Sequence, residues 1–268
     1  MPKKNTMSKN PIGVMDSGVG GISVLKHIHT LLPHEHLVYF ADSAHAPYGN
    51  KSPEEIKDRC FAVADFLIAQ QAKALVVACN TATAAAITDM RAAYDLPIIG
   101  MEPAVKPAAT ATKNGVIGVL ATVGTLKSAQ FAALLESYGR NVKVITQGCI
   151  GLVECIERGE LDTAETKALI KQYTSPLLAE GADTIVLGCT HYPFVRPLIE
   201  EIAGPEVAII DTGAAVAKQV QHKLIESDCI NDSNELANIQ LYSNSQHSAA
   251  HQVIETLWGQ TAAIQTLT

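Results

Sequence analysis

The sequence predicts an α/β protein built from two similar halves, each with a parallel β-sheet, and an active site in the cleft between them. Three observations predict this class. Short apolar runs alternate with longer stretches of helical character, which is typical of a parallel sheet covered by helices on both faces. The alternation restarts near residue 116. Two strand-and-loop segments of the first half then recur, in the same order, in the second half.

The elements of the first half follow from its apolar runs and helix starts. The helix that begins at Ser52 has the clearest start, Ser-Pro-Glu-Glu, with proline at the first helical position and acids in the first turn. We expect strands at 11–15, 37–40, 75–78 and 97–100, and helices at 20–32, 52–70 and 83–94.

The second half repeats this alternation, and the tail adds a strand at 239–242 and a helix at 248–258. We expect its strands at 116–120, 142–145, 184–187 and 207–210, and its helices at 128–138, 163–179 and 211–225. We assign the tail to the first domain. The predicted domains are therefore 11–104 plus 214–268, and 105–213, with 1–10 as a flexible leader.

Two pairs of segments carry the internal repeat. The segment 12–15 resembles 117–120, and 75–81 resembles 185–191, with offsets of 105 and 110 positions. Either match alone is weak, but two matches in order at nearly one offset indicate related halves. Ligands of such folds bind at the carboxyl ends of the strands, in the cleft.

Composition excludes several classes of function. The chain has 268 residues, a net charge of -7 and 18% charged residues, with 47% hydrophobic residues for a core. The acidic balance argues against non-specific nucleic-acid binding, which needs clustered lysine and arginine. The first ten residues are polar and no long apolar stretch follows them, so we expect no membrane span and a cytoplasmic location.

Two of the six cysteines stand at the recurring motifs. Cys79 in ACNTAT and Cys189 in GCTHYP each follow a predicted buried strand. In a reducing cytoplasm we expect thiols rather than disulfides. If the halves face each other, the two thiols enter one cleft from opposite sides. Inverting a carbon needs a base on one face and an acid on the other, and thiols with modestly lowered pKa values serve both purposes.

Polar neighbours favour this chemistry. Asn80, Thr81 and Thr83 follow Cys79, where a helix start would stabilise a thiolate and offer N–H groups to a carboxylate. His191 follows Cys189 and is a candidate proton partner. Asp16 ends the first strand. It supplies a carboxylate near Cys79, holds a substrate ammonium, or caps a helix or turn.

Two other patterns suggest less. The segment 18–21 (GVGG) lacks the lysine and spacing of a phosphate loop, so its glycines more simply allow close approach to a ligand or close packing. The pairs His27/His29 and His34/His36 are spaced by two residues, which do not share a helix face, and 32–36 is expected to be an exposed loop. We expect no metal site.

The motifs PIGVMDSGVGG, PYG (47–49), ACNTAT and GCTHYP closely resemble the cofactor-independent aspartate/glutamate racemase superfamily, and within it the glutamate racemases. The resemblance runs from residue 11 to the C-terminal helix. It implies two flavodoxin-like domains and an isomerase that interconverts L- and D-glutamate without a cofactor. It also implies D-glutamate supply for peptidoglycan, hence a role in cell-wall biogenesis and cell shape.

The resemblance also assigns roles. It implies that Cys79 takes the α-proton from D-glutamate with help from Asp16, and that Cys189 takes it from L-glutamate with help from His191. It further implies that these two helpers and eight other residues bind the substrate: Ser17, Tyr48, Gly49, Asn80, Thr81, Thr122, Thr125 and Thr190.

The family places a glutamate shortly after a Cys-Pro segment, and here the spacing from Cys149 matches Glu157, with Glu154 nearby. Ile150 stands where the family has proline, and Phe131 where it often has tyrosine. Which glutamate assists the second cysteine therefore stays open.

Three alternatives remain: a sister racemase acting on aspartate or another small acid, a non-catalytic metabolite-binding regulator, and a thiol-redox protein. The last needs Cys79 and Cys189 close enough to bridge. We also expect a homodimer, although the sequence shows neither the oligomeric state nor any allosteric activator.

Overall fold

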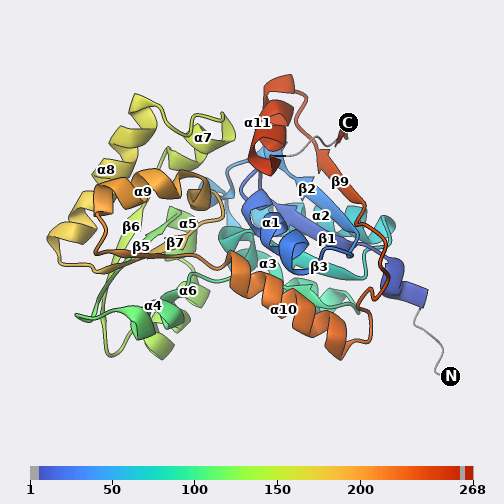
Figure 1. The fold of residues 1–268 in the computed structure, drawn as a ribbon, viewed down its shortest axis with the longest axis horizontal. Coiled ribbons are helices and arrows are strands. Elements are labelled where there is room, and N and C mark those ends of the chain that lie inside the picture. The colour runs from blue at the N-terminus through green and yellow to red at the C-terminus, as the bar shows by residue number, and fades with distance from the viewer. Residues whose placement is uncertain (1–5, 260–262, 268) are drawn as a thin grey trace.

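The computed structural model describes residues 6–259 and 263–267. Two α/β lobes lie side by side, each built on its own parallel sheet (Figure 1). This confirms the fold class predicted from the sequence. No helix in the described part of the chain is both long and apolar enough to cross a membrane.

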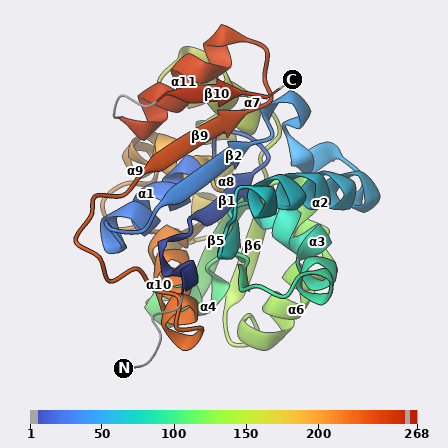
Figure 2. The same ribbon diagram turned by 90° about the vertical axis from the view of Figure 1, so that its right-hand side faces the viewer.

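The first lobe holds a six-stranded sheet of order β10-β9-β2-β1-β3-β4, in which every pair is parallel. Its strands are β1 (Ile12–Asp16), β2 (Leu37–Ala41), β3 (Ala74–Val77), β4 (Ile98–Ile99), β9 (Ile239–Ser243) and β10 (Ile264–Thr266). Its helices are α1 (Ile22–Leu31), α2 (Pro53–Ala69), α3 (Asn80–Ala93), α10 (Gly213–Glu226) and α11 (Ser248–Trp258). Helices α1, α10 and α11 cover one face of the sheet, and α2 and α3 cover the other (Figure 2).

The second lobe holds a four-stranded parallel sheet of order β6-β5-β7-β8. Its strands are β5 (Val116–Ala121), β6 (Lys143–Gly148), β7 (Thr184–Gly188) and β8 (Ala208–Ile210). Its helices are α4 (Val105–Ala111), α5 (Val123–Leu126), α6 (Ala129–Tyr138), α7 (Leu152–Glu157), α8 (Ala164–Ala179) and α9 (Arg196–Ala203). Helices α8 and α9 lie on one face, and α4 and α6 on the other (Figure 1).

The two sheets share the order that defines flavodoxin-like folds. The run β2-β1-β3-β4 in the first lobe corresponds to β6-β5-β7-β8 in the second. Strands β1 and β5 are therefore equivalent, as are β3 and β7, which is the correspondence that the sequence repeat predicted. Consequently Cys79, after β3, and Cys189, after β7, occupy equivalent places in the two lobes.

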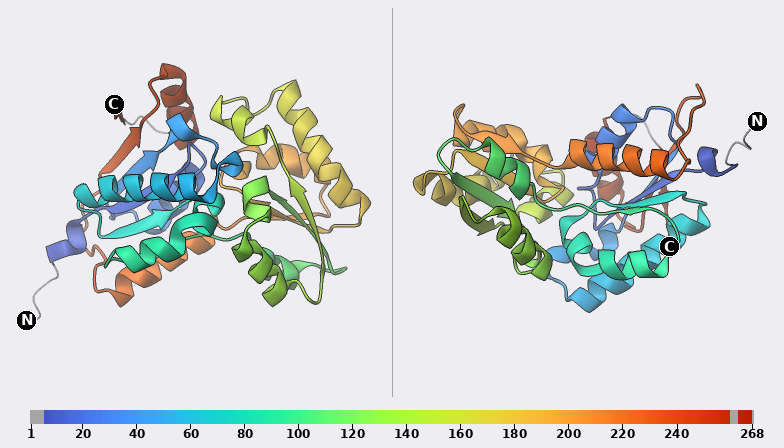
Figure 3. Two further views of the ribbon diagram at one scale, coloured as in Figure 1. Left: turned by 180° about the vertical axis from the view of Figure 1, so that it is seen from behind. Right: turned by 90° about the horizontal axis from the view of Figure 1, so that it is seen from below.

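The chain passes between the lobes twice, after β4 and after β8 (Figure 3). Helix α10, which follows the second passage, packs against α1 of the first lobe. At each passage the chain leaves the strands of one sheet and enters those of the other. We therefore propose that the first domain comprises 11–104 plus 214–268 and the second 105–213.

Local sequence explains the firmest elements. The strands β1, β2 and β3 are buried along their whole length because helices cover both faces of the sheet. Helix α2 starts with a capping box: Ser52 Oγ accepts from Glu55 N, while the Glu55 carboxylate accepts from Ser52 N at 2.9 Å.

The structure also differs from the expectations. The short helices α4, α5, α7 and α9 and strand β10 were missed, because elements of three to eight residues carry little periodicity. Residues Thr6–Lys9 of the predicted leader form a 3₁₀ turn, and residues 1–5 lie outside the described residues. The prediction of an exposed loop at 32–36 was wrong for Leu32 and Glu35, which are buried, and Glu35 is paired with Lys73.

Candidate active site

Cys79 stands where β3 ends and α3 begins. The helix was expected over 83–94, but it starts at Asn80 with Cys79 itself as the N-cap, which confirms the helix start considered for the thiolate at this cysteine. The Cys79 Sγ accepts a hydrogen bond from the Ala82 N–H at 3.4 Å and lies 3.8 Å from Ser17 Oγ. The side chain is only 5% exposed. The end of a buried strand thus fixes the sulfur beside the free N–H groups of a helix.

Cys189 stands at the corresponding end of β7, and a chain of polar contacts runs from it. Its Sγ lies 3.6 Å from Nδ1 of His191, and Nε2 of His191 lies 2.6 Å from Oε1 of Glu157. The same carboxylate oxygen accepts from the backbone N–H of Val19 at 2.7 Å. Val19 belongs to the first lobe, so Glu157 joins the Cys189–His191 pair to the opposite lobe.

Asp16, at the end of β1, is buried beneath the same site. Its Oδ2 accepts from the backbone N–H groups of Gly18 and Gly21 at 3.1 and 3.0 Å. Its Oδ1 lies 3.4 Å from the Thr190 hydroxyl of the second lobe. Asp16 therefore caps the turn after β1, as one of the alternatives from the sequence had it, and also contacts the Cys189 motif across the cleft.

The glycines of 18–21 make room for these side chains. A Cβ at Gly18 would lie 1.8 Å from Oε1 of Glu157, and a Cβ at Gly20 would lie 2.3 Å from Nδ1 of His191. The close packing that the sequence suggested for this segment is thus directed at the Glu157–His191 pair.

Both sulfurs line one cavity between the lobes. The cavity has a volume of about 10 Å³, close to the space that one water molecule needs. The cavity is therefore too small in this structure to hold an amino acid, so it must widen before one binds. Most residues of the lining have a polar side chain or a thiol, and they come from both lobes: Ser17, Pro47, Tyr48, Gly49, Cys79, Asn80, Thr81, Thr122, Val153, Cys189, Thr190 and His191.

Three threonine hydroxyls join the lobes beside this cavity. Thr81 Oγ1 lies 2.9 Å from Thr122 Oγ1 and 3.1 Å from Thr125 Oγ1, and the latter two lie 3.0 Å apart. The Asn80 side chain is buried, with neither amide atom hydrogen-bonded within the described protein. Because an unsatisfied buried amide is costly, Asn80 is suited to a polar ligand.

Two residues differ from their expected use. The Thr83 hydroxyl donates to the Val77 carbonyl and accepts from the Met101 N–H, so it serves the fold. The Tyr48 hydroxyl donates to the buried carboxylate of Asp42, and its side chain is 1% exposed. Tyr48 therefore lines the cavity without a free O–H to offer it.

Burial shapes the acid–base properties of the site. The prediction of a lowered pKa for Cys79 was wrong: burial raises the pKa of this thiol well above its ordinary value, and the Asp16 carboxylate adds to the rise. Burial also raises the pKa of Asp16, to about 6. For His191, burial acts to lower the pKa, but hydrogen bonds with Cys189 and Glu157 outweigh burial and raise the pKa well above its ordinary value.

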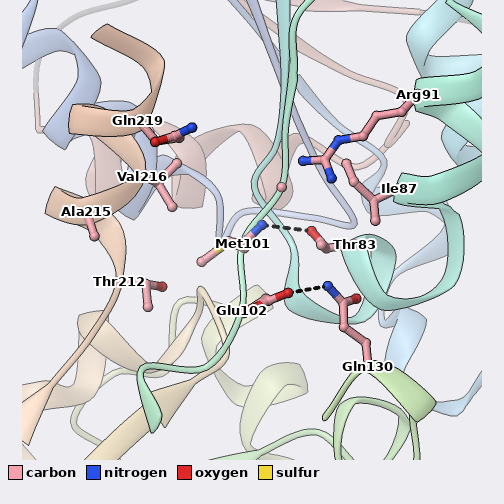
Figure 4. A pocket seen from close by; sticks show the side chains of 11 residues that line it. Thr83, Ile87, Arg91, Met101, Glu102, Gln130, Thr212, Ala215, Val216 and Gln219 are labelled. Atoms are coloured by element: carbon pink, nitrogen blue, oxygen red, sulfur yellow. Dashed lines mark hydrogen bonds between the residues drawn. The ribbon is translucent and has the colours of Figure 1, made fainter. Parts of the chain in front are cut away.

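A second cavity, of about 320 Å³, lies where the linker after β4 leaves the first lobe (Figure 4). Arg91 from α3 and Gln219 from α10 face each other across it, and Glu102 of the linker is hydrogen-bonded to Gln130 of the second lobe. Neither cysteine of the site lines this cavity.

Sequence reasoning missed several residues of the site. Val19 and Pro47 lie in motifs that carried the resemblance but were given no role, and Val153 has no chemical signal in the sequence. Ser23 donates to the Thr190 carbonyl at 2.8 Å across the lobes, a contact that spans 167 positions. Glu157 was singled out by spacing alone, and its contact with His191 distinguishes it from Glu154, which lines a neighbouring pocket.

Two α/β lobes that each bring a thiol and polar partners to one shared cavity have the architecture of an amino-acid racemase. The profile of the Asp/Glu/Hydantoin racemase family matches residues 12–220. The chain belongs to this family, as the sequence motifs predicted.

Individual proteins agree with the family. A glutamate racemase of Stutzerimonas stutzeri is 54% identical over 256 residues, which are 95% of this chain and 96% of that protein. The crystal structure of glutamate racemase isoform RacE1 from Bacillus anthracis matches with a TM-score of 0.89 and 34% identity, over 97% and 98% of the two chains. Glutamate racemase from Francisella tularensis in complex with D-glutamate matches with a TM-score of 0.84 and 29% identity, over 97% and 98%.

Proposed function

We propose that the protein is a glutamate racemase that interconverts L- and D-glutamate without a cofactor. The observation that carries the proposal is that Cys79 and Cys189, from equivalent places in two lobes, line a single cavity. The 54% identical relative is named a glutamate racemase, and the Francisella neighbour binds D-glutamate. Both lend support to glutamate as the substrate.

The two thiols are the proposed acid and base. In the direction from L- to D-glutamate, the α-C–H bond breaks and its proton passes to Sγ of Cys189. The thiol proton of Cys79 passes to the opposite face of the same carbon. The raised pKa of Cys79 keeps this group protonated and ready to donate. The imidazolium of His191, 3.6 Å from Cys189 Sγ, attracts a thiolate there.

The carbanion needs stabilisation beyond the thiols. General acid–base groups supply about 10²–10⁴-fold of rate, so donors around the α-carboxylate must supply much of the remainder. Asn80, whose amide has no hydrogen-bond partner within the described protein, and the hydroxyls of Ser17, Thr81 and Thr190 are the proposed donors. Closure of the lobes removes water and strengthens these interactions.

We assign the supporting roles by contact. Glu157 holds His191 in its protonated form through the 2.6 Å hydrogen bond to Nε2, so Glu157 rather than Glu154 assists the second cysteine. Asp16, whose carboxylate adds to the rise in the pKa of Cys79, is the proposed support for proton transfer on that side.

The wider role follows the family resemblance. We propose that the protein works in the cytoplasm and that the D-glutamate it produces supplies peptidoglycan synthesis. The homodimer expected from the sequence stays a prediction.

The test is a racemisation assay by circular dichroism on purified protein without added cofactor, with L-glutamate, D-glutamate and both enantiomers of aspartate. We expect glutamate to racemise in both directions and aspartate to react far more slowly. Faster turnover of aspartate would reassign the substrate, and no turnover of any of them would contradict the racemase proposal.

A further inference from the structure

We propose that Asp42 is a positioning residue for the racemase reaction: its buried carboxylate fixes the wall of the active cavity that Tyr48 and Gly49 form. The inference rests on the proposed function, because the cavity is the site of that reaction. Asp42 does not line the cavity itself, whereas Tyr48 does. Asp42 therefore acts on the cavity through Tyr48.

The wall belongs to a loop with little support of its own. After β2 ends at Ala41, residues 43–50 form two 3₁₀ turns, Ser43–His45 and Tyr48–Asn50, rather than a strand or long helix. Pro47, Tyr48 and Gly49 from this loop line the cavity together with both thiols. The shape of the wall therefore depends on the groups that hold the loop.

Asp42 is the point where these groups meet. Its side chain is fully buried, and both oxygens accept hydrogen bonds. Oδ2 accepts from the Tyr48 hydroxyl and from Nε of Arg59 at 2.9 Å. Oδ1 accepts from Nη2 of Arg59 at 2.8 Å, pairs with Nδ1 of His45 at 2.9 Å, and accepts from the Asn244 amide.

These contacts tie the loop to two distant elements. Arg59 lies on α2, and its two nitrogens bind the carboxylate as a fork, which compensates the cost of burying the charge. Asn244 follows β9 in the C-terminal part of the chain, and its Oδ1 also accepts from the Ala44 N–H at 2.9 Å. The loop is therefore clamped on both sides through one carboxylate.

The position of the wall matters for the closed cavity. A Cβ at Gly49 would lie 2.9 Å from the Cβ of Thr122, so the loop is in tight contact with the second lobe. Thr122 in turn hydrogen-bonds Thr81. A loop that moves away from α2 would therefore disturb both the substrate wall and the contact between lobes, while Cys79 and Cys189 stay fixed by their own strands.

The experiment compares the full-length variants Arg59→Met, Arg59→Lys and Tyr48→Phe with wild type, with Arg140→Met as the control. Arg140 is an exposed arginine just after α6 that pairs with Glu136 of that helix, and it does not line the cavity. Tyr48→Phe removes the hydroxyl that joins Asp42 to the wall and leaves the Arg59 pair intact. Two quantities are measured: amide hydrogen exchange of residues 43–50, and KM and kcat for L- and D-glutamate.

We expect Arg59→Met and Tyr48→Phe to exchange faster at residues 43–50, with unchanged exchange in β1 and β3. We expect KM to rise about tenfold and kcat to fall less, because a lost hydrogen bond to a charged group loosens the wall without moving the thiols. Arg59→Lys, which keeps the charge, should restore most of the wild-type KM, and Arg140→Met should match wild type throughout.

The proposal is overturned if exchange at residues 43–50 is unchanged in both Arg59→Met and Tyr48→Phe. It is also overturned if activity falls only in proportion to the folded fraction while KM stays constant, as a purely structural role would require. A wild-type protein without racemase activity would contradict the proposed function instead, and the exchange comparison would still decide whether Asp42 fixes the wall.

Discussion

Glu157 is the residue that most directly links the chemistry to the contact between lobes. Its carboxylate binds both Nε2 of His191 and the N–H of Val19. We predict that Glu157→Gln lowers kcat/KM about 10²-fold, the low end for an acid–base group, because His191 loses its negative partner. The loss must be equal in both directions, since the two enantiomers have equal free energy. Steady-state kinetics with L- and D-glutamate measure it.

The matched control is Glu154→Gln, one turn earlier on α7. Glu154 lines a neighbouring pocket, and we expect this variant to stay within twofold of wild type. If Glu154→Gln proved as damaging as Glu157→Gln, the assignment of the supporting carboxylate would fail.

Asp16 is expected to cost stability for the sake of function. Its pKa rises from 3.8 to about 6 on folding, so the folded state binds the proton more tightly than the unfolded chain does. The contribution of Asp16 to the free energy of unfolding is therefore lost as the pH rises from 3.8 to about 6. Above pH 6 the total loss is about 3 kcal/mol at most.

We predict that Asp16→Asn, which cannot ionise, raises the free energy of unfolding at pH 8 and that the gain shrinks toward pH 4. It should also lower racemase activity. Urea unfolding at the two pH values measures the effect. A variant less stable than wild type at pH 8 would show that the charge is needed to hold the Gly18 and Gly21 N–H groups.

At the scale of elements, the turn between β1 and α1 is shaped by what packs on it. A Cβ at Gly20 would meet His191, and the nearest atom lies in a buried ring that has little room to move. We predict that Gly20→Ala lowers kcat/KM at least tenfold while the protein stays folded, because the His191–Glu157 pair is displaced.

Gly148→Ala is a suitable comparison for this variant. There the added Cβ would lie 3.0 Å from a methyl group of Val123, which is the end of a side chain. Kinetics beside far-ultraviolet circular dichroism separate the two cases. If Gly20→Ala were as active as Gly148→Ala, the turn at residues 18–21 would not support the site.

Elements with strong local signals were predictable. The strands β1, β3, β5 and β7 carry apolar runs, and α2 carries its capping box, so their types and approximate bounds follow from the sequence. The start of α3 was misplaced by three residues because a cysteine N-cap lies outside the usual set of capping residues. Helix α7, which carries Glu157, has six residues and was not recognised.

At the scale of the whole molecule, the arrangement places two thiols between lobes and others within them. Cys60 and Cys155 are fully buried inside the first and second lobe, whereas Cys79 and Cys189 line the cavity between lobes. We predict that iodoacetamide modifies Cys79 and Cys189 well before Cys60 and Cys155, because separation of the lobes exposes only the first pair, and that glutamate slows this reaction.

Peptide mass spectrometry of each site over time measures these rates. Equal rates at all four cysteines would indicate that general unfolding, rather than movement of the lobes, gives access to the site.

The sequence predicted that the two lobes would share a site, but it did not predict the contacts between them. The repeat indicated that Cys79 and Cys189 would meet, because equivalent strands end at equivalent edges. The contacts that complete the site were not predictable, since Val19 and Glu157 lie 138 positions apart and leave no mark on either segment. The raised pKa of Cys79 was also missed, because it depends on burial in the folded protein, which the sequence does not display.

The most direct test of the two-thiol account is racemisation in D₂O by wild type and by Cys79→Ala. With wild type, L-glutamate should yield D-glutamate carrying deuterium at Cα, detected by proton magnetic resonance. With Cys79→Ala, inversion should be abolished in both directions, because one face of the carbon has lost its proton donor and acceptor. Inversion that persists in this variant would contradict the account.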